Sequence, residues 1–134
     1  MDFVTLPESL EVEELEEYYN IFLDEYEGKP KNLDALKQLY ELAYRQWDTY
    51  EKLKDDIAVR IEKYIMDAMN LTSYDITDII ISIVENLSLK TIFHYLIDSK
   101  DSISSPSIKR LITEAEEEYS DTIDNPYDEL DDWF

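Results

Sequence analysis

Carboxylates are the most abundant side chains of this chain that could do chemistry: it contains 33 Asp and Glu, compared with 12 Lys and Arg. Two acidic pairs, Glu13/Glu17 and Glu114/Glu118, have the four-residue spacing that brings side chains together on a helix. Such pairs could in principle exchange protons or hold a metal ion. With so many acids, pairs at this spacing arise by chance, and we interpret both as solvated helix faces.

Other catalytic groups are scarce. The chain has no Cys, one Gly and one His, which excludes thiol chemistry, zinc fingers and glycine-rich phosphate loops. His94 lies in a mostly apolar segment and is predicted to pack against another helix. The residue three positions before it is Thr91, so the Glu-x-x-His pattern of helical di-iron sites is missing. The stretch 121–132 lacks the central glycine of a calcium loop. We therefore expect no enzyme, metal or cofactor.

The negative charge is concentrated at the two ends of the sequence. Residues 1–28 contain ten acids and no base, and residues 111–134 contain the same. Residues 29–110 are nearly neutral, with thirteen acids and twelve bases. Such a field repels nucleic acid and anionic lipid and attracts basic surfaces. We therefore expect a basic protein as the partner, rather than a nucleic acid or a membrane.

The acidic ends supply the predicted partner-binding residues. Their carboxylates would pair with Arg or Lys, while aromatic side chains would supply a desolvated anchor. Tyrosines inside the acidic segments, including Tyr19 and Tyr127, are predicted to make contacts. The full predicted set is Glu11, Glu13, Glu14, Glu16, Glu17, Tyr18, Glu114, Glu116, Glu117, Glu118, Tyr119, Asp128, Glu129, Asp131, Asp132, Trp133 and Phe134.

The segment Tyr127–Phe134 alternates acids with aromatic residues. It resembles the acidic tips of single-stranded-DNA-binding proteins, which also finish on Phe. The resemblance implies that the last ring enters an apolar pocket of a partner while basic residues hold the carboxylates. Two alternatives stay open: a disordered acidic tail, or a tail folded back with Trp133 and Phe134 packed on the domain.

The composition predicts an all-α fold. One glycine in 134 residues leaves few of the turns that strands and phosphate loops require, and 44% apolar residues can form a core. We expect one all-helical domain over 1–134, with an acidic tail at 120–134. It should be a compact bundle of five or six helices whose first and last helices are acidic. No signal peptide or membrane span is evident, so we expect a soluble, cytoplasmic protein.

Local signals place the helices. Thr5 and Glu8 have capping-box spacing, so the first helix is expected to begin near 5–7 and to end at a left-handed Gly28. A long apolar stripe over 36–68 indicates either one helix or two that are broken near 54–56. The remaining signals are N-caps and the segments they precede: Asn32 before that stripe, Thr72 or Ser73 before a central helix 74–87, Ser88 before 89–97, and Ser105 with Pro106 before a helix through about Tyr119.

Three functions fit these properties. The first is a non-enzymatic inhibitor of a basic, nucleic-acid-acting protein, because carboxylates can occupy a cleft that is built for phosphates. This class includes immunity proteins and antitoxins against nuclease toxins, and phage DNA mimics that act against restriction or CRISPR effectors. The alternative is an adaptor or secretion-type chaperone that holds an apolar partner segment in a groove. In the third, the charge serves solubility alone.

Overall fold

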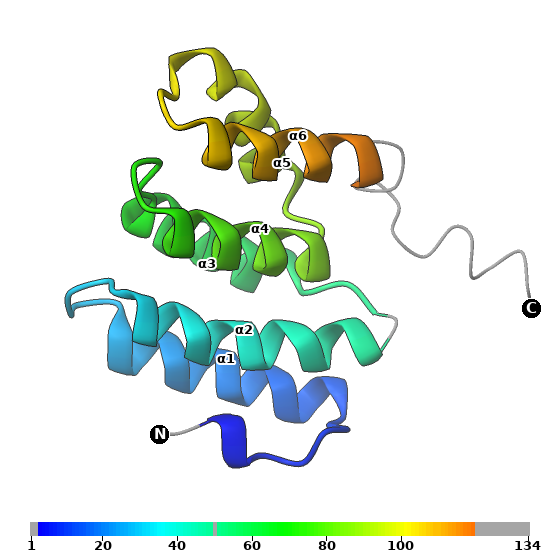
Figure 1. The fold of residues 1–134 in the computed structure, drawn as a ribbon. Coiled ribbons are helices and arrows are strands. Elements are labelled where there is room, and N and C mark those ends of the chain that lie inside the picture. Colours follow the sequence, from blue (N-terminus) through cyan, green and yellow to red (C-terminus); the bar gives the residue numbers. More distant parts are fainter. Residues whose placement is uncertain (1–2, 50, 120–134) are drawn as a thin grey trace, which may run out of the picture.

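Six α-helices are stacked in two layers in the computed structural model, which describes residues 3–49 and 51–119 (Figure 1). One layer holds three helices side by side, and the other layer holds the three that alternate with them along the chain. The first layer consists of α1 (Val12–Tyr26), α3 (Asp55–Ala68) and α5 (Lys90–Asp98). The second layer consists of α2 (Leu33–Asp48), α4 (Tyr74–Leu87) and α6 (Pro106–Tyr119). The described part contains no strand, and the predicted all-α bundle is confirmed.

The first helix begins later than the sequence predicts. A short 3-10 turn, η1 (Phe3–Thr5), comes first, and α1 starts at Val12 with Glu11 and Glu14 forming the capping box. The expected cap at Thr5 is therefore wrong. The segment before α1 is instead held by α2, because the Arg45 guanidinium donates hydrogen bonds to the carbonyl oxygens of Leu6 (2.9 Å) and Pro7 (2.8 Å).

The turn after α1 also differs from expectation. Gly28 does not take the left-handed conformation that favours glycine at a helix end. The final cap is Glu27, with right-handed backbone angles, whose N–H donates to the carbonyl oxygen of Leu23. The helix is thus followed by a turn, and Lys31 donates a hydrogen bond to the Glu27 carbonyl oxygen (3.0 Å).

The remaining N-caps fall mainly where the sequence places them. Asn32 accepts a hydrogen bond from the amide of Ala35, and the hydroxyls of Ser73 and Ser105 cap α4 and α6 in the same way. The long stripe is two helices, since α2 ends at Asp48 and α3 begins at Asp55. The three caps are confirmed because capping is a local interaction between neighbours in sequence. The break between the two helices begins earlier than the expected 54–56, because α2 already ends at Asp48.

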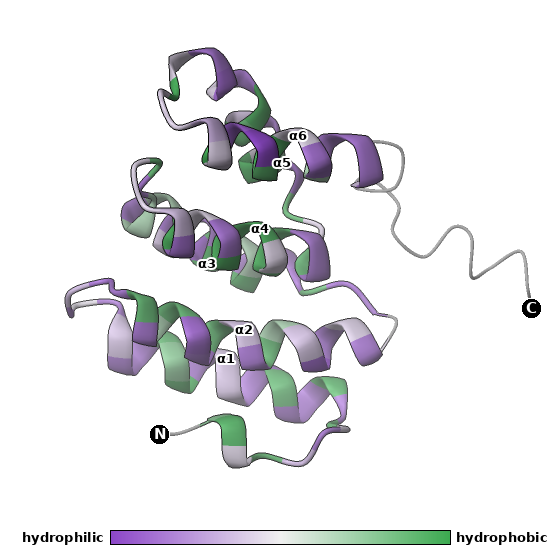
Figure 2. Ribbon diagram, in the orientation of Figure 1, coloured by the Kyte–Doolittle hydropathy of each residue, from purple (hydrophilic) through white to green (hydrophobic). Residues whose placement is uncertain are grey.

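The core lies between the layers and is centred on α4. As predicted, α4 is the central helix: it packs against α2, α5 and α6 and buries most of its aliphatic side chains. Phe22 of α1 meets the ring of Tyr64 of α3 edge-on, with centroids 5.0 Å apart. Figure 2 shows the resulting amphipathic pattern, with green and purple alternating along α1 and α6 mostly purple.

Ser88 does not cap α5, contrary to the prediction. It lies at the C-terminal end of α4 in the left-handed conformation (φ 55°, ψ 48°), and the N–H of Leu89 donates to the carbonyl oxygen of Val84. The Ser88 hydroxyl is buried without a hydrogen-bond partner in the described structure. A two-residue reversal between α4 and α5 requires this geometry, which disfavours any residue that has a Cβ.

Replacing Ser88 by glycine is therefore expected to stabilise the fold. Glycine relieves the left-handed strain and removes the unsatisfied hydroxyl, which outweighs the entropy it adds to the unfolded chain, by about 0.5–1.5 kcal/mol. Urea unfolding measures the change. Ser107→Gly is the matched control, because Ser107 is exposed within the first turn of α6 and glycine there should cost about 0.5–1 kcal/mol. Equal effects of the two substitutions would contradict the strain assigned to Ser88.

Candidate partner-binding surfaces

A row of three exposed carboxylates runs along α1: Glu13, Glu17 and Asp24, hereafter the α1 acid row. Their helical positions fall within about 40° of one another, so they share one face. Their separations along the helix axis are about 6 and 10 Å. None of the three forms an ion pair with another residue that the structure describes.

Other predicted acids are already engaged inside the molecule. Glu16 pairs with Lys54 (3.1 Å), and Glu116 pairs with Lys100 (2.7 Å). Glu11 and Glu14 satisfy the backbone at the start of α1. These four carboxylates can still add to the field, but a partner would have to compete with an existing contact.

The acids of α6 form a second, separate surface. Glu114, Glu117 and Glu118 are exposed on this helix. Figure 1 places α1 at one end of the stack and α6 at the other, with α2 and α4 between them. The two acidic helices therefore do not share a face. The predicted residues of the tail, 128–134, lie outside the described residues.

The aromatic residues that were predicted to contact a partner differ in how exposed they are. Tyr19 is fully buried and its hydroxyl donates to the carbonyl oxygen of Leu42 (3.2 Å), so its predicted contact role is wrong. Tyr18 is half-buried and meets the ring of Phe3 edge-on at 6.0 Å. His94 is exposed, contrary to the predicted packing role, because it faces away from the buried side of α5. Tyr127 lies outside the described residues.

Tyr119, at the end of α6, joins a small acidic cluster on α4. Its hydroxyl donates a hydrogen bond to the carboxylate of Glu85. Burial raises the pKa of Glu85 to about 7, and the neighbouring Glu118 and Asp78 add to the increase, while the Tyr119 hydrogen bond opposes it. Near neutral pH this carboxyl group is therefore partly protonated.

Glu85→Gln is expected to reduce the fall in the free energy of unfolding that occurs as the pH rises from 4.5 to about 7. The pKa of Glu85 is raised on folding from 4.5 to about 7, so the unfolded state releases this proton first. The free energy of unfolding then falls as the pH rises between those values. Because the group is only half-buried, screening limits the loss to about 1–2 kcal/mol at pH 8. Urea unfolding from pH 4 to 8 measures it.

Glu117→Gln is the control for that measurement, because it removes the same charge from an exposed position of α6. We expect it to change stability by less than about 0.5 kcal/mol at any pH. If the two variants follow the same pH profile, burial of Glu85 does not govern the slope.

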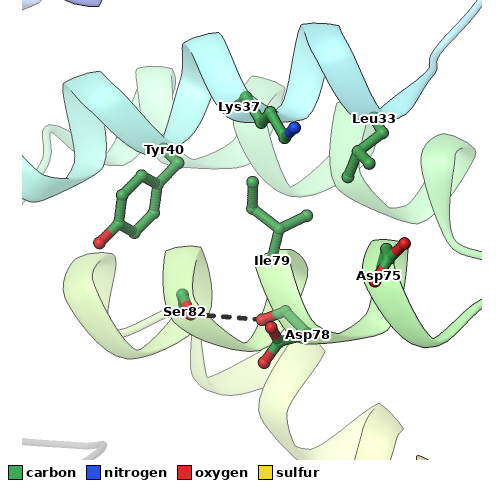
Figure 3. Close-up of a pocket in the computed structure, with 7 residues that line it drawn as sticks. All are labelled: Leu33, Lys37, Tyr40, Asp75, Asp78, Ile79 and Ser82. Atoms are coloured by element: carbon green, nitrogen blue, oxygen red, sulfur yellow. Dashed lines mark hydrogen bonds between the residues drawn. The ribbon is translucent and has the colours of Figure 1, made fainter.

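A groove with both apolar and charged walls lies between α2 and α4 (Figure 3). Its volume is about 350 Å³. Leu33, Lys37 and Tyr40 line it from α2, whereas Asp75, Asp78, Ile79 and Ser82 line it from α4. Figure 3 shows Ile79 pointing towards α2 between Tyr40 and Leu33.

Sequence reasoning missed this groove. Tyr40 falls within the apolar stripe over 36–68, which predicts a core position, yet it remains half-buried. Ile79 is likewise only partly covered, although α4 is otherwise the most buried helix. The available signal was the unusually wide apolar surface of α4, which exceeds what one helical neighbour can cover.

The described part of the chain is all-α, exposes carboxylates on α1 and α6, and has a groove with apolar and charged walls between α2 and α4. Among residues 3–49 and 51–119, no group of three or more His, Cys, Asp or Glu side chains is placed to hold a metal ion. No helix in this part is long and apolar enough to cross a membrane. Comparison with protein-family models, with curated proteins and with solved structures finds no significant match.

Proposed function

We propose that this chain is a non-enzymatic inhibitor that binds and neutralises a basic, nucleic-acid-acting protein. The partner would be a nuclease-type toxin or a nucleic-acid-binding effector, so the chain would act as an immunity protein, an antitoxin or a phage DNA mimic. Its own acidity makes binding to nucleic acid unfavourable.

The α1 acid row is the observation that carries this proposal. Glu13, Glu17 and Asp24 are exposed, share one face of α1 and have no ion-pair partner among the described residues. Carboxylates held on one rigid helix face lose little freedom when a basic surface docks, and opposite fields speed the encounter. The acids on α6 extend the same field to the other end of the stack.

Capture from host lysate on the immobilised full chain tests the proposal. Capture at low salt followed by a salt gradient, read by mass spectrometry, should release one basic nuclease or nucleic-acid-binding protein at high salt. The purified partner should then lose its activity on nucleic acid when the chain is added. A partner that is indifferent to salt, or one that stays active in the complex, would overturn the proposal.

The α2–α4 groove favours a second candidate, an adaptor or chaperone that holds an apolar segment. Leu33, Tyr40 and Ile79 give the groove an apolar floor, and its volume could hold one or two side chains of a partner. Binding that survives high salt and depends on Tyr40 and Ile79 would distinguish this function from inhibition by charge.

A further inference from the structure

We infer that the groove between α2 and α4 seats an arginine side chain of a partner protein. The inference deepens the proposed function, on which it rests for the partner's basic character, by naming the feature that the chain would hold. The binding site itself is argued from the groove, and the α1 acid row lies in the other layer of the stack.

The shape of the groove suits a long side chain with an aliphatic stem. Leu33 of α2 and Ile79 of α4 are both half-buried and present methyl groups to the hollow. Tyr40 lies at one end, with its ring partly exposed (Figure 3). An arginine stem would cover the aliphatic surface, and its planar guanidinium would stack against the Tyr40 ring.

The charges of the groove select a cation. Asp75 and Asp78 line the α4 wall, and both are exposed without an ion pair to any described residue. The Ser82 hydroxyl is occupied, because it donates to the Asp78 backbone carbonyl (3.3 Å). Two carboxylates are the acceptors that a guanidinium prefers. Lys37, on the α2 wall, is the opposing charge, and a bound arginine would displace its flexible ammonium group.

The test is an NMR titration of the full chain with a capped tripeptide of leucine, arginine and leucine. The expected result is a set of chemical-shift changes at Leu33, Ile79 and Asp75, with a Kd on the order of millimolar. The same peptide with citrulline, which keeps the shape of arginine and loses its charge, should bind about tenfold more weakly.

Three variants are expected to change the affinity for the arginine peptide, two by lowering it and one by raising it. Asp75→Asn combined with Asp78→Asn should weaken binding at least about fivefold, and Tyr40→Leu about threefold. Lys37→Met should strengthen binding about two- to threefold, because it removes the repelling charge. The control, Asp48→Asn combined with Asp67→Asn, removes the same charge from exposed positions outside the groove and should leave the Kd unchanged.

Several outcomes would overturn the inference. Equal binding of the citrulline peptide would identify an apolar ligand, and weaker binding by Lys37→Met would identify an anionic one. Shift changes at these residues on dilution of the chain alone would assign the groove to a second copy. No shift change at about 10 mM peptide would leave no arginine site. The proposed function would survive each of these outcomes if salt-sensitive capture of a basic inhibited partner still held.

Discussion

Replacing Glu13, Glu17 and Asp24 together by lysine is expected to weaken binding of the proposed basic partner more than about 100-fold. The α1 acid row makes no ion pair in the described structure, so its removal breaks no internal salt bridge. Reversing each charge converts an attraction into a repulsion, which is why the effect exceeds simple neutralisation. Surface plasmon resonance at about 50 and 500 mM salt measures the change, most of which should vanish at the higher salt.

A charge-matched variant makes that result specific. Asp48, Asp67 and Asp98 are exposed and lie in the last turns of α2, α3 and α5. Lysine at these positions changes the net charge by the same amount and complements the helix dipole. If this control weakens binding as much as the α1 variant does, only the total charge matters and the row has no special role.

Arg45→Met is expected to destabilise the fold by about 2–4 kcal/mol. Arg45 is a nearly buried base, with its side chain 4% exposed. It holds the carbonyl oxygens of Leu6, Pro7 and Glu41 together with the Glu41 carboxylate (2.9 Å). Methionine fills a similar volume but leaves these acceptors unpaired. Urea unfolding measures the loss, and hydrogen exchange should show the Phe3 amide, which donates to Gln38, becoming unprotected first.

Arg60→Met is the matched comparison for Arg45. Arg60 pairs with Glu27 at 3.1 Å, but the two side chains are 40% and 48% exposed. Such surface pairs contribute about 0–1 kcal/mol. Arg45→Lys should lie between the two, because a single ammonium cannot reach all the acceptors. Similar losses for Arg45→Met and Arg60→Met would show that the guanidinium does not anchor the N-terminal segment.

Local chemistry explains how much of the fold could be predicted. The caps at Asn32, Ser73 and Ser105 are interactions between residues three apart, so the sequence displays them directly. The start of α1 could not be found in this way. Thr5 and Glu8 match a capping box, but Arg45, 38 residues after Pro7, holds this segment in a non-helical path.

Less of the candidate site could be predicted, because it also depends on contacts between residues that are distant in sequence. Composition and charge placement identified the acidic ends, but they could not separate Glu17 from Glu16, because the pairing of Glu16 depends on Lys54 in another helix. The groove brings Tyr40 and Ile79 together from helices that are distant in sequence. Whether such side chains are fully or partly covered is set by packing, which periodicity does not encode.

The two-layer stack ends near α1 on one side and near α6 on the other (Figure 1). A stack of this kind can in principle be prolonged by another copy, since each new helix pair only needs the surface of the last. Here the exposed side chains of the terminal helices include the carboxylates of Glu13, Glu17, Glu114 and Glu117. Copies that approached end to end would bring like charges together. These terminal carboxylates therefore oppose end-to-end growth of the stack into a filament.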